Sequence, residues 1–434
     1  MKGIIETIFK DHFGIDLKTW AVNFEVAYRK KNKDKFEFFT KKYSQHVAAE
    51  LCKDKAKRRF YLDGDLFIYV QNCFPYADVK ALTPQEFLLY PVCSIEEIIR
   101  MRKPSCASDL LLKVRSDAIA DHPRITRVYL SRYDRAKHGW TLTGAFDDTP
   151  FTAYKDKLSA EHMVLCDNTP AGFVFITDPN GTCESTEFGN IIYISEALKH
   201  YLYYMNLFIL CFKEISLEDR FNSFMIAVRT MLLAEALDFD LDSRGDLPQE
   251  IDSWLTAVVK DQLDFVIGHE YAHHLLGHLD GCSLSKSTHP SLLKESLGKY
   301  YNYDQRQEFD ADFNSIKHAH YTEQQIDDVA NAAIIYFIGL DLFDHVKYFL
   351  SPPTGGIKSH PDPIDRAWAI HNLFGTGKTA YRKDDLEYFV NMADELKSFL
   401  TNEFMPFNPD AFEIAGSVYL PSYRNHSLID RIDF

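Results

Sequence analysis

Gly268-His269-Glu270-Tyr271-Ala272-His273 is the stretch that decides the fold of this 434-residue chain. Apolar residues lead into it at helical spacing, at Leu255, Val258, Val259, Leu263, Val266 and Ile267. Residues four apart share one face of a helix, so His269 and His273 can direct two imidazoles at one metal ion. Glu270 then points beside them, where a carboxylate can activate a water. The sequence therefore predicts a metal-binding helix.

A third ligand is expected further along the chain, in Glu308-Phe309-Asp310-Ala311-Asp312. On a helix Glu308 and Asp312 share a face, so Glu308 can complete the ligand set while Asp312 holds the far nitrogen of a ligand histidine. Two imidazoles and one carboxylate make a three-ligand zinc site with an open position, which is typical of catalytic zinc. Zinc lowers the pKa of its water to roughly 7, and Glu270 can take the proton. The alternative is an acidic, solvated helix face.

Two further histidines follow the motif without fitting a ligand pattern. His278 lies nine residues after the first histidine of the motif, whereas the metzincin pattern requires Gly at plus seven and His at plus ten. This chain has Leu276 and Leu279 at those positions. His274 points to another side of the helix than its neighbour. We expect His274 and His278 to be surface residues or to lie behind the ligands.

These residues resemble the gluzincin peptidases that include the CAAX prenyl protease of the Ste type and the bacterial heat-shock membrane protease. That family pairs H-E-x-x-H with a later E-x-x-x-D and adds a His-Pro followed by an Arg, matched here by His360-Pro361 and Arg366. The resemblance covers about residues 175 to 375 and implies a zinc peptidase. Phage-exclusion and stress-regulator peptidases are a looser resemblance, which suggests a defence or regulatory role.

His360 and Arg366 are expected to act on the substrate. Peptide hydrolysis builds an oxyanion, and a His or Arg donor can stabilise it on the side opposite zinc. Alternatively, His360 binds the zinc itself in a resting state, and Arg366 pairs with Asp362 or Asp365 in a structural role.

The expected fold class is α+β, with a zincin-like catalytic domain in which a small sheet packs on the active-site helix. Short apolar runs between turn formers predict the strands 127–130, 140–143, 163–165, 173–176 and 191–194. An apolar helix is expected from Ser195 to about Phe212. Asp246 is expected to cap the helix that carries the motif, with Gln249 as its reciprocal partner.

The length of the chain predicts two or three domains. Residues 1–122 have a mainly helical pattern without a catalytic motif, and we expect them to control access or to select the substrate. Residues 123–390 are expected to form the metallopeptidase domain, and residues 391–434 a C-terminal extension packed on it.

Composition and charge indicate which cellular compartment and which classes of partner to expect. The formal net charge is −15, and no basic face is built at scale, so a nucleic-acid partner is not expected. None of the eight cysteines forms a C-x-x-C pair, and scattered cysteines without a signal peptide indicate a reducing cytoplasm. The apolar stretches 201–212 and 330–350 are too short or too interrupted by charge to span a membrane, so both are expected to be buried helices.

The sequence favours a cytoplasmic, zinc-dependent endopeptidase that holds one Zn²⁺ ion. Its protein or peptide substrate would add to an edge strand of the sheet. The alternative is a zinc-binding sensor or regulatory scaffold with little turnover, against which the intact Glu270 argues. A third possibility is a metallohydrolase that acts on another kind of bond, because the motif defines the mechanism more closely than the bond cleaved.

Overall fold

The computed structural model describes most of the chain from Cys93 onward. The described residues are 93–120, 141–176, 180–232, 244–279, 305–352, 360–412 and 418–420, with short pieces at 59–61, 67–69, 86, 89 and 239. The chain divides into two compact units, Met1–Ser105 with Arg115–Phe146, and Cys106–Val114 with Asp147–Phe434. The domain boundary expected near residue 122 stays a prediction, because it falls on residues outside the described part.

The first unit contains a short antiparallel pair, β1 (Arg59–Tyr61) and β2 (Phe67–Tyr69), and the helix α8 (Ile95–Arg102). A capping box starts α8, because Ser94 accepts from the Glu97 amide while the Glu97 carboxylate accepts from the Ser94 amide. The same carboxylate also accepts from the amides of Leu142 and Thr143. A strand pair therefore lies within the stretch predicted to be mainly helical.

A three-stranded sheet forms one layer of the second unit. Its strands are β3 (Ala171–Val174), β4 (Gly181–Thr186) and β5 (Gly189–Ser195), in the order β3-β5-β4. β5 pairs with β3 in parallel and with β4 in antiparallel orientation. The strands predicted at 173–176 and 191–194 correspond to β3 and β5, whereas β4 was not predicted.

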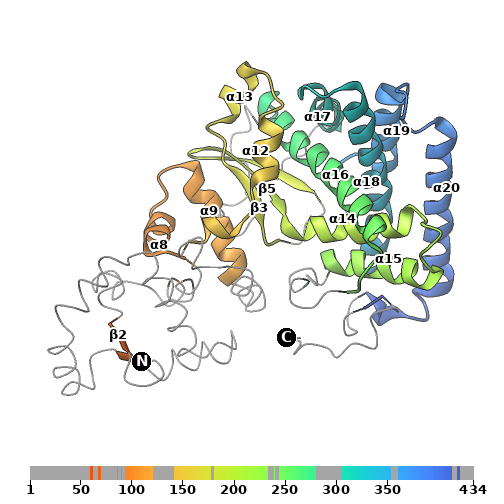
Figure 1. Cartoon of the computed structure of the whole chain (residues 1–434), viewed down its shortest axis with the longest axis horizontal. Helices are drawn as coiled ribbons and strands as arrows, with labels where there is room; N and C mark the ends of the chain where they lie inside the picture. The colour runs from red at the N-terminus through yellow and green to blue at the C-terminus, as the bar shows by residue number, and fades with distance from the viewer. Residues whose placement is uncertain are drawn as a thin grey trace. The chain divides into compact units, whose positions relative to one another are not determined.

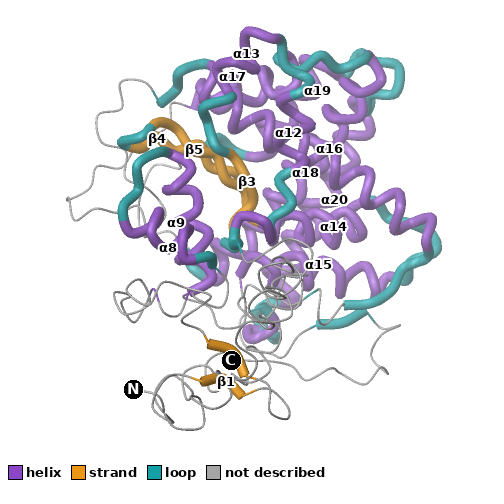
Figure 2. The backbone as a smooth tube through the Cα atoms, turned by 60° about the vertical axis from the view of Figure 1, so that its left-hand side comes forward, coloured by secondary structure: helices purple, strands orange, loops and turns teal. Residues whose placement is uncertain are grey.

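The sheet is covered on both faces. Side chains alternate along a strand, and Ile191 and Tyr193 of β5 pack with Leu111 and Val114 from the first turns of α9 (Ala107–Ala120). Figures 1 and 2 show α9 on one side of the sheet and α16 (Gln249–Leu275) on the other. The predicted packing of a small sheet on the motif helix is therefore present.

Two of the predicted strands are wrong, and a third lies outside the described residues. Residues 163–165 belong to the helix α13 (Ala160–Cys166), whose cap Ser159 accepts from the amide of His162, and residues 143–145 form a 3₁₀ turn. Val164 and Leu165 are 66% and 53% exposed, so this apolar run faces solvent on a short helix. A run of three apolar residues carries no period that separates a strand from a helix. The strand predicted at 127–130 lies outside the described residues.

Helices make up most of the other described residues of the second unit. They are α12 (Thr149–Lys155), α14 (Glu196–Ile209), α15 (Leu217–Leu232), α17 (Gln305–Lys317), α18 (Glu323–Leu350), α19 (Pro363–Phe374) and α20 (Lys383–Phe399), followed by a π-helical turn at Leu400–Phe404 and a 3₁₀ turn at Pro409–Ala411. α14, α17 and α18 contact α16, which lies at the centre of this layer (Figure 1). The two apolar stretches fall in α14 and α18, largely buried as predicted. No helix in the described part of the chain is long and apolar enough to cross a membrane.

A reciprocal amide pair joins α14 to α16. Asn206 donates to the side-chain oxygen of Gln262 at 2.8 Å, and Gln262 donates back to Asn206 at 3.0 Å. Both side chains are fully buried, so each satisfies polar groups of the other that water cannot reach.

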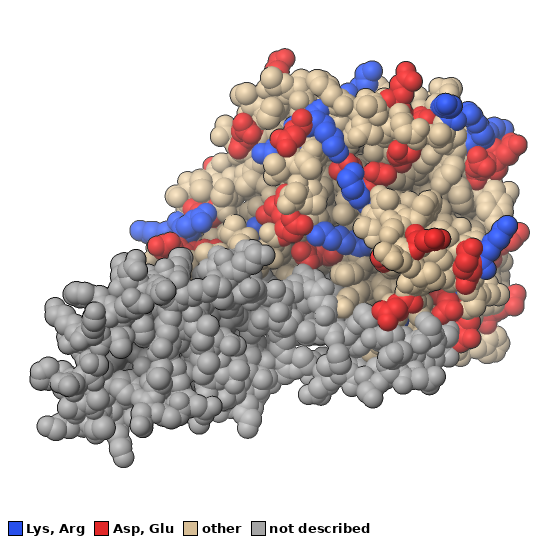
Figure 3. Space-filling view, viewed as in Figure 1, with Lys and Arg blue, Asp and Glu red and all other residues tan. Residues whose placement is uncertain are grey.

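Charge is mixed on the surface. On the face shown in Figure 3, acidic and basic side chains are interspersed over the helical layer, with no gathered basic stripe among the described residues.

Candidate metal centre

The C-terminal half of α16 carries the motif into the interior. Every residue from Gln262 to His273 is buried, including His269 and His273 at 7% and 3% exposure. The helix begins at Gln249, with Pro248 at the N-cap and no side-chain cap, so the predicted capping by Asp246 is wrong. A proline there supplies a fixed φ and has no amide to satisfy, which starts the helix without a capping side chain.

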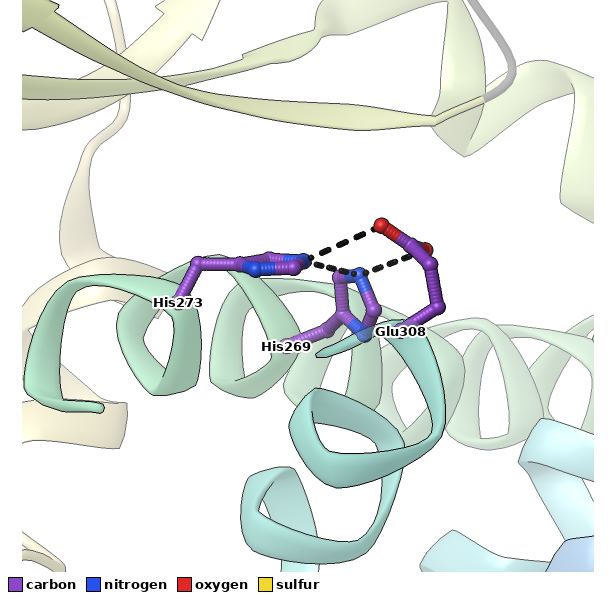
Figure 4. A group of neighbouring side chains, drawn as sticks. All are labelled: His269, His273 and Glu308. Carbon is purple, nitrogen blue, oxygen red and sulfur yellow. Dashed lines mark hydrogen bonds and ion pairs between the residues drawn. The ribbon is translucent and has the colours of Figure 1, made fainter. Parts of the chain in front are cut away.

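The three predicted ligands come together between α16 and α17. The Nε2 atoms of His269 and His273 lie 3.0 Å apart. Glu308 Oε2 lies 3.5 Å from the first of these nitrogens, and Glu308 Oε1 lies 3.4 Å from the second. Figure 4 shows the two rings and the carboxylate converging on one point. Within the described residues, this is the one group of three or more His, Cys, Asp or Glu side chains that could hold a metal ion.

The chemistry of this group fits a cation. Glu308 is fully buried, and neither of its carboxylate oxygens accepts a hydrogen bond of regular geometry. The two imidazole nitrogens also face each other, which is favourable only when something positive lies between their lone pairs. A buried carboxylate beside two such nitrogens costs free energy unless it is neutralised. A metal ion would satisfy all three side chains, although these atoms do not select one metal over another.

Asp312 and Arg366 support His269 from behind. Asp312 Oδ1 lies 2.9 Å from His269 Nδ1, the nitrogen that faces away from the ligand group. Arg366, on α19, donates to both oxygens of Asp312 at 2.7 and 2.6 Å, and all three side chains are buried. A bidentate arginine both neutralises and orients a carboxylate. Asp312 therefore lies where the sequence predicted it, one turn after Glu308 and against a ligand histidine.

Electrostatics differ between the two histidines. Burial on its own lowers the pKa of His269, but Asp312 and Glu308 outweigh burial and raise that pKa to about 10. Burial dominates at His273 and lowers its pKa to about 4. Burial would raise the pKa of Glu308, yet His269, His273 and His360 hold it well below its usual range. Asp312 and Glu308 therefore stabilise a positive charge on the His269 ring itself.

Glu270 lies under the start of β4. It is buried, and a Cβ added to Gly181 would lie 2.5 Å from its Cγ and 2.6 Å from its Oε1. Real Cβ atoms do not approach so closely, so the side chain of Glu270 occupies the space that a residue larger than glycine would need at position 181. Sequence reasoning missed Gly181, because β4 was not predicted.

His360 and Arg366 occupy different positions. His360 Nδ1 lies 2.9 Å from Glu308 Oε2, with its side chain 40% exposed, but His360 is not within the group that could share one ion. Arg366 is buried against Asp312, with Nη1 3.5 Å from Glu308 Oε2, and its guanidinium lies 4.5 Å from the ring centroid of Phe337. Its ionic partners are thus on α17, not Asp362 or Asp365.

His274 and His278, the two histidines after the motif, make different contacts. The ring of His274 contacts Thr169 at 3.0 Å and Asn190 at 2.9 Å, which ties the ends of α13 and the start of β5 to α16. His278 lies behind the ligands, with its Nδ1 2.9 Å from Nδ1 of His273. Gly277, directly before His278, is the sequence signal for a helix end that brings this contact about.

No protein family, curated protein or solved structure matches the chain in comparisons with known proteins. A function for the chain therefore has to come from the chemistry of this centre.

Proposed function

We propose that the chain is a metal-dependent hydrolase of the zinc peptidase class, in which His269, His273 and Glu308 hold the ion and Glu270 is the general base. The observation that carries this proposal is the buried ligand group, with three ligands from two helices. Structural zinc sites usually have four protein ligands, whereas catalytic sites have three and an open position. The described residues supply three.

In the proposed reaction, the metal ion and the residues of the chain have different roles. Zinc in this centre would supply Lewis acidity toward a substrate carbonyl and a water molecule. Glu270 accepts the proton of the attacking water and passes it to the leaving amine, a general-base role that suits a buried carboxylate directly after His269 in the motif. Asp312 keeps the proton of His269 on Nδ1, which leaves Nε2 free to bind.

A peptide substrate is favoured by the position of β4. This strand is at an edge of the sheet in the described part of the chain, and its first residue lies against Glu270. An extended peptide can add to such an edge through main-chain hydrogen bonds. Strand addition would bring the scissile bond past the general base, which supports the zincin-like, gluzincin reading of the chain.

We assign different roles in the proposed reaction to His360 and Arg366. His360 is half exposed beside Glu308, so it can donate to a substrate oxygen at the rim of the centre. Arg366 is buried and engaged by Asp312, so it positions the ligand support and does not touch substrate.

The alternative of a zinc sensor or scaffold rests on the depth of burial, since all three ligands are at most 7% exposed. Measuring zinc and hydrolysis in the same preparations separates the two functions. Protein purified without chelators is analysed for bound metal and for cleavage of casein and of a cellular proteome. We expect about one zinc per chain, and Glu270→Gln should keep the zinc and lower cleavage by about 10²–10⁴-fold.

Glu250→Gln is the matched control, because Glu250 is exposed in the first turn of the same helix. It should leave both quantities unchanged. Zinc binding without cleavage of any protein, in wild type and Glu270→Gln alike, would favour the sensor. Protein that neither contains nor takes up a divalent metal would exclude both functions.

A further inference from the structure

The end of α16 is a glycine-terminated turn that folds the chain back over the metal centre. Gly277 has a φ of +67°, a left-handed conformation that favours glycine. Its amide donates to His274 O at 3.2 Å, and the amide of His278 donates to His273 O at 3.1 Å. This pair of bonds is the Schellman motif, in which the second residue past the helix returns to the last turn.

The residue that returns in this chain is a histidine, and the residue that it meets is a metal ligand. Apolar side chains commonly make this contact at helix ends. Here the rings of His278 and His273 have centroids 5.0 Å apart at 69°, and their Nδ1 atoms lie 2.9 Å apart. One of these two nitrogens must carry the hydrogen that joins them.

The direction of that hydrogen bond follows from the ligand group. His273 presents Nε2 to His269 and Glu308, so a bound ion requires Nε2 without a proton. The proton of the neutral ring is then on Nδ1, and His273 donates it to Nδ1 of His278. His278 is not itself a ligand, because it reaches the side of His273 that faces away from the centre.

We propose that His278 is a positioning residue of the metal centre, which fixes the ring and tautomer of His273 as Asp312 fixes those of His269. This inference rests on the proposed function only in that the centre binds a metal. A ligand histidine usually donates its second nitrogen to a carboxylate or a carbonyl. In this centre one ligand has a charged support and the other a neutral one, supplied by the helix cap.

Metal affinity tests the assignment without an activity assay. The zinc dissociation constant is measured by competition with a chromophoric chelator, and the thermal unfolding of metal-free protein is recorded in parallel. His278→Phe keeps the size of the ring but has no acceptor, so zinc affinity should fall about 10–100-fold. His278→Asn offers an amide oxygen close to the position of Nδ1 and should keep affinity within a few-fold of wild type. His278→Ala serves where the phenylalanine is not accommodated.

His274→Phe is the matched control, because His274 is the neighbouring histidine and contacts Thr169 and Asn190 instead of a ligand. It should lower the unfolding temperature of the metal-free protein while leaving zinc affinity within a few-fold. Wild-type affinity in both His278→Phe and His278→Ala would overturn the assignment, as would an equal loss in His278→Asn. Protein that binds zinc without hydrolysis would defeat the peptidase proposal and leave this result intact, whereas wild type without zinc affinity would defeat both.

Discussion

The two sides of the candidate metal centre are supported by different kinds of side chain. On the side of His269, a carboxylate and a guanidinium from α17 and α19 form a buried, charged chain of contacts. On the side of His273, the support comes from the cap of the same helix and is a half-buried, neutral imidazole. The first side depends on three segments distant in sequence, and the second on the six consecutive residues from His273 to His278. Charged residues distant in sequence therefore orient His269, whereas the local geometry of the helix end orients His273.

The largest effect should come from breaking the charged side. Arg366→Met leaves Asp312 as a buried carboxylate without its bidentate partner, which should lower the free energy of unfolding by about 3–5 kcal/mol. Denaturant titration of metal-free protein measures it. Lys383→Met is the control, because Lys383 pairs with Glu387 in solvent and such pairs contribute about 0–1 kcal/mol. Equal effects in the two variants would show that the buried pair adds nothing to the fold.

The second comparison is between the supports themselves. Asp312→Asn should weaken zinc binding by about 10–100-fold, and at least as much as His278→Phe, because a carboxylate polarises a ligand imidazole more strongly than a neutral ring does. Chelator competition measures both. Asp365→Asn, on exposed α19 surface, should keep wild-type affinity. A larger loss in His278→Phe than in Asp312→Asn would reverse the order of the two supports.

Gly181 allows a test of the space above Glu270. Gly181→Ala forces a Cβ into contact with that side chain, and overpacking of this kind costs about 1–3 kcal/mol. The cost should disappear in the Glu270→Ala background, where the colliding atoms are absent. Thermal unfolding of the four proteins gives the coupling, and Ser185→Ala on the same strand serves as control. Additive effects of the two substitutions would mean that the cost of the added Cβ does not come from Glu270.

The smallest effect concerns a histidine outside the centre. Burial, with His162 nearby, lowers the pKa of His318 to about 4, against 6.5 in an unfolded chain. Between those values the unfolded state binds more protons, so stability falls as pH drops from 6.5 to 4. Because His318 is only partly buried, about 1 kcal/mol is expected. His318→Gln should remove this part of the difference in unfolding free energy between pH 7 and pH 5, and an unchanged difference would contradict it.

Local patterns predicted the helix that carries the motif and the candidate ligands of the buried group, because their information is contained in short spacings. Helical periodicity placed His269 and His273 on one face, and the four-residue spacing placed Asp312 one turn after Glu308. The parallel pairing of β3 with β5 and the intervening β4 could not be read in the same way. β4 is the strand Gly-Thr-Cys-Glu-Ser-Thr, whose polar composition gives no apolar alternation, and its place depends on contacts with α16.

The partners of Arg366 show where sequence reasoning stops. Nearby acids in the sequence, Asp362 and Asp365, were the expected partners, but α19 directs the guanidinium to Asp312, 54 residues away. Ion pairs between helices depend on how the helices pack, and spacing in the sequence carries no such information. The contact of His278 with His273 was not predicted either, although Gly277, a residue typical of helix ends, stands directly before His278 in the sequence.

The amide pair between Asn206 and Gln262 has a consequence for how reliably α16 assumes one orientation. Gln262 precedes His269 by two turns and lies on the same stripe of the helix. Turning α16 by one residue about its axis would swing that stripe by about 100°. Such a turn would leave both side-chain amides buried without hydrogen-bond partners. Each unsatisfied group would lower the free energy of unfolding by about 1–3 kcal/mol. The amide pair thus stabilises one rotation of α16 about its axis over the others. In that rotation His269 and His273 face Glu308.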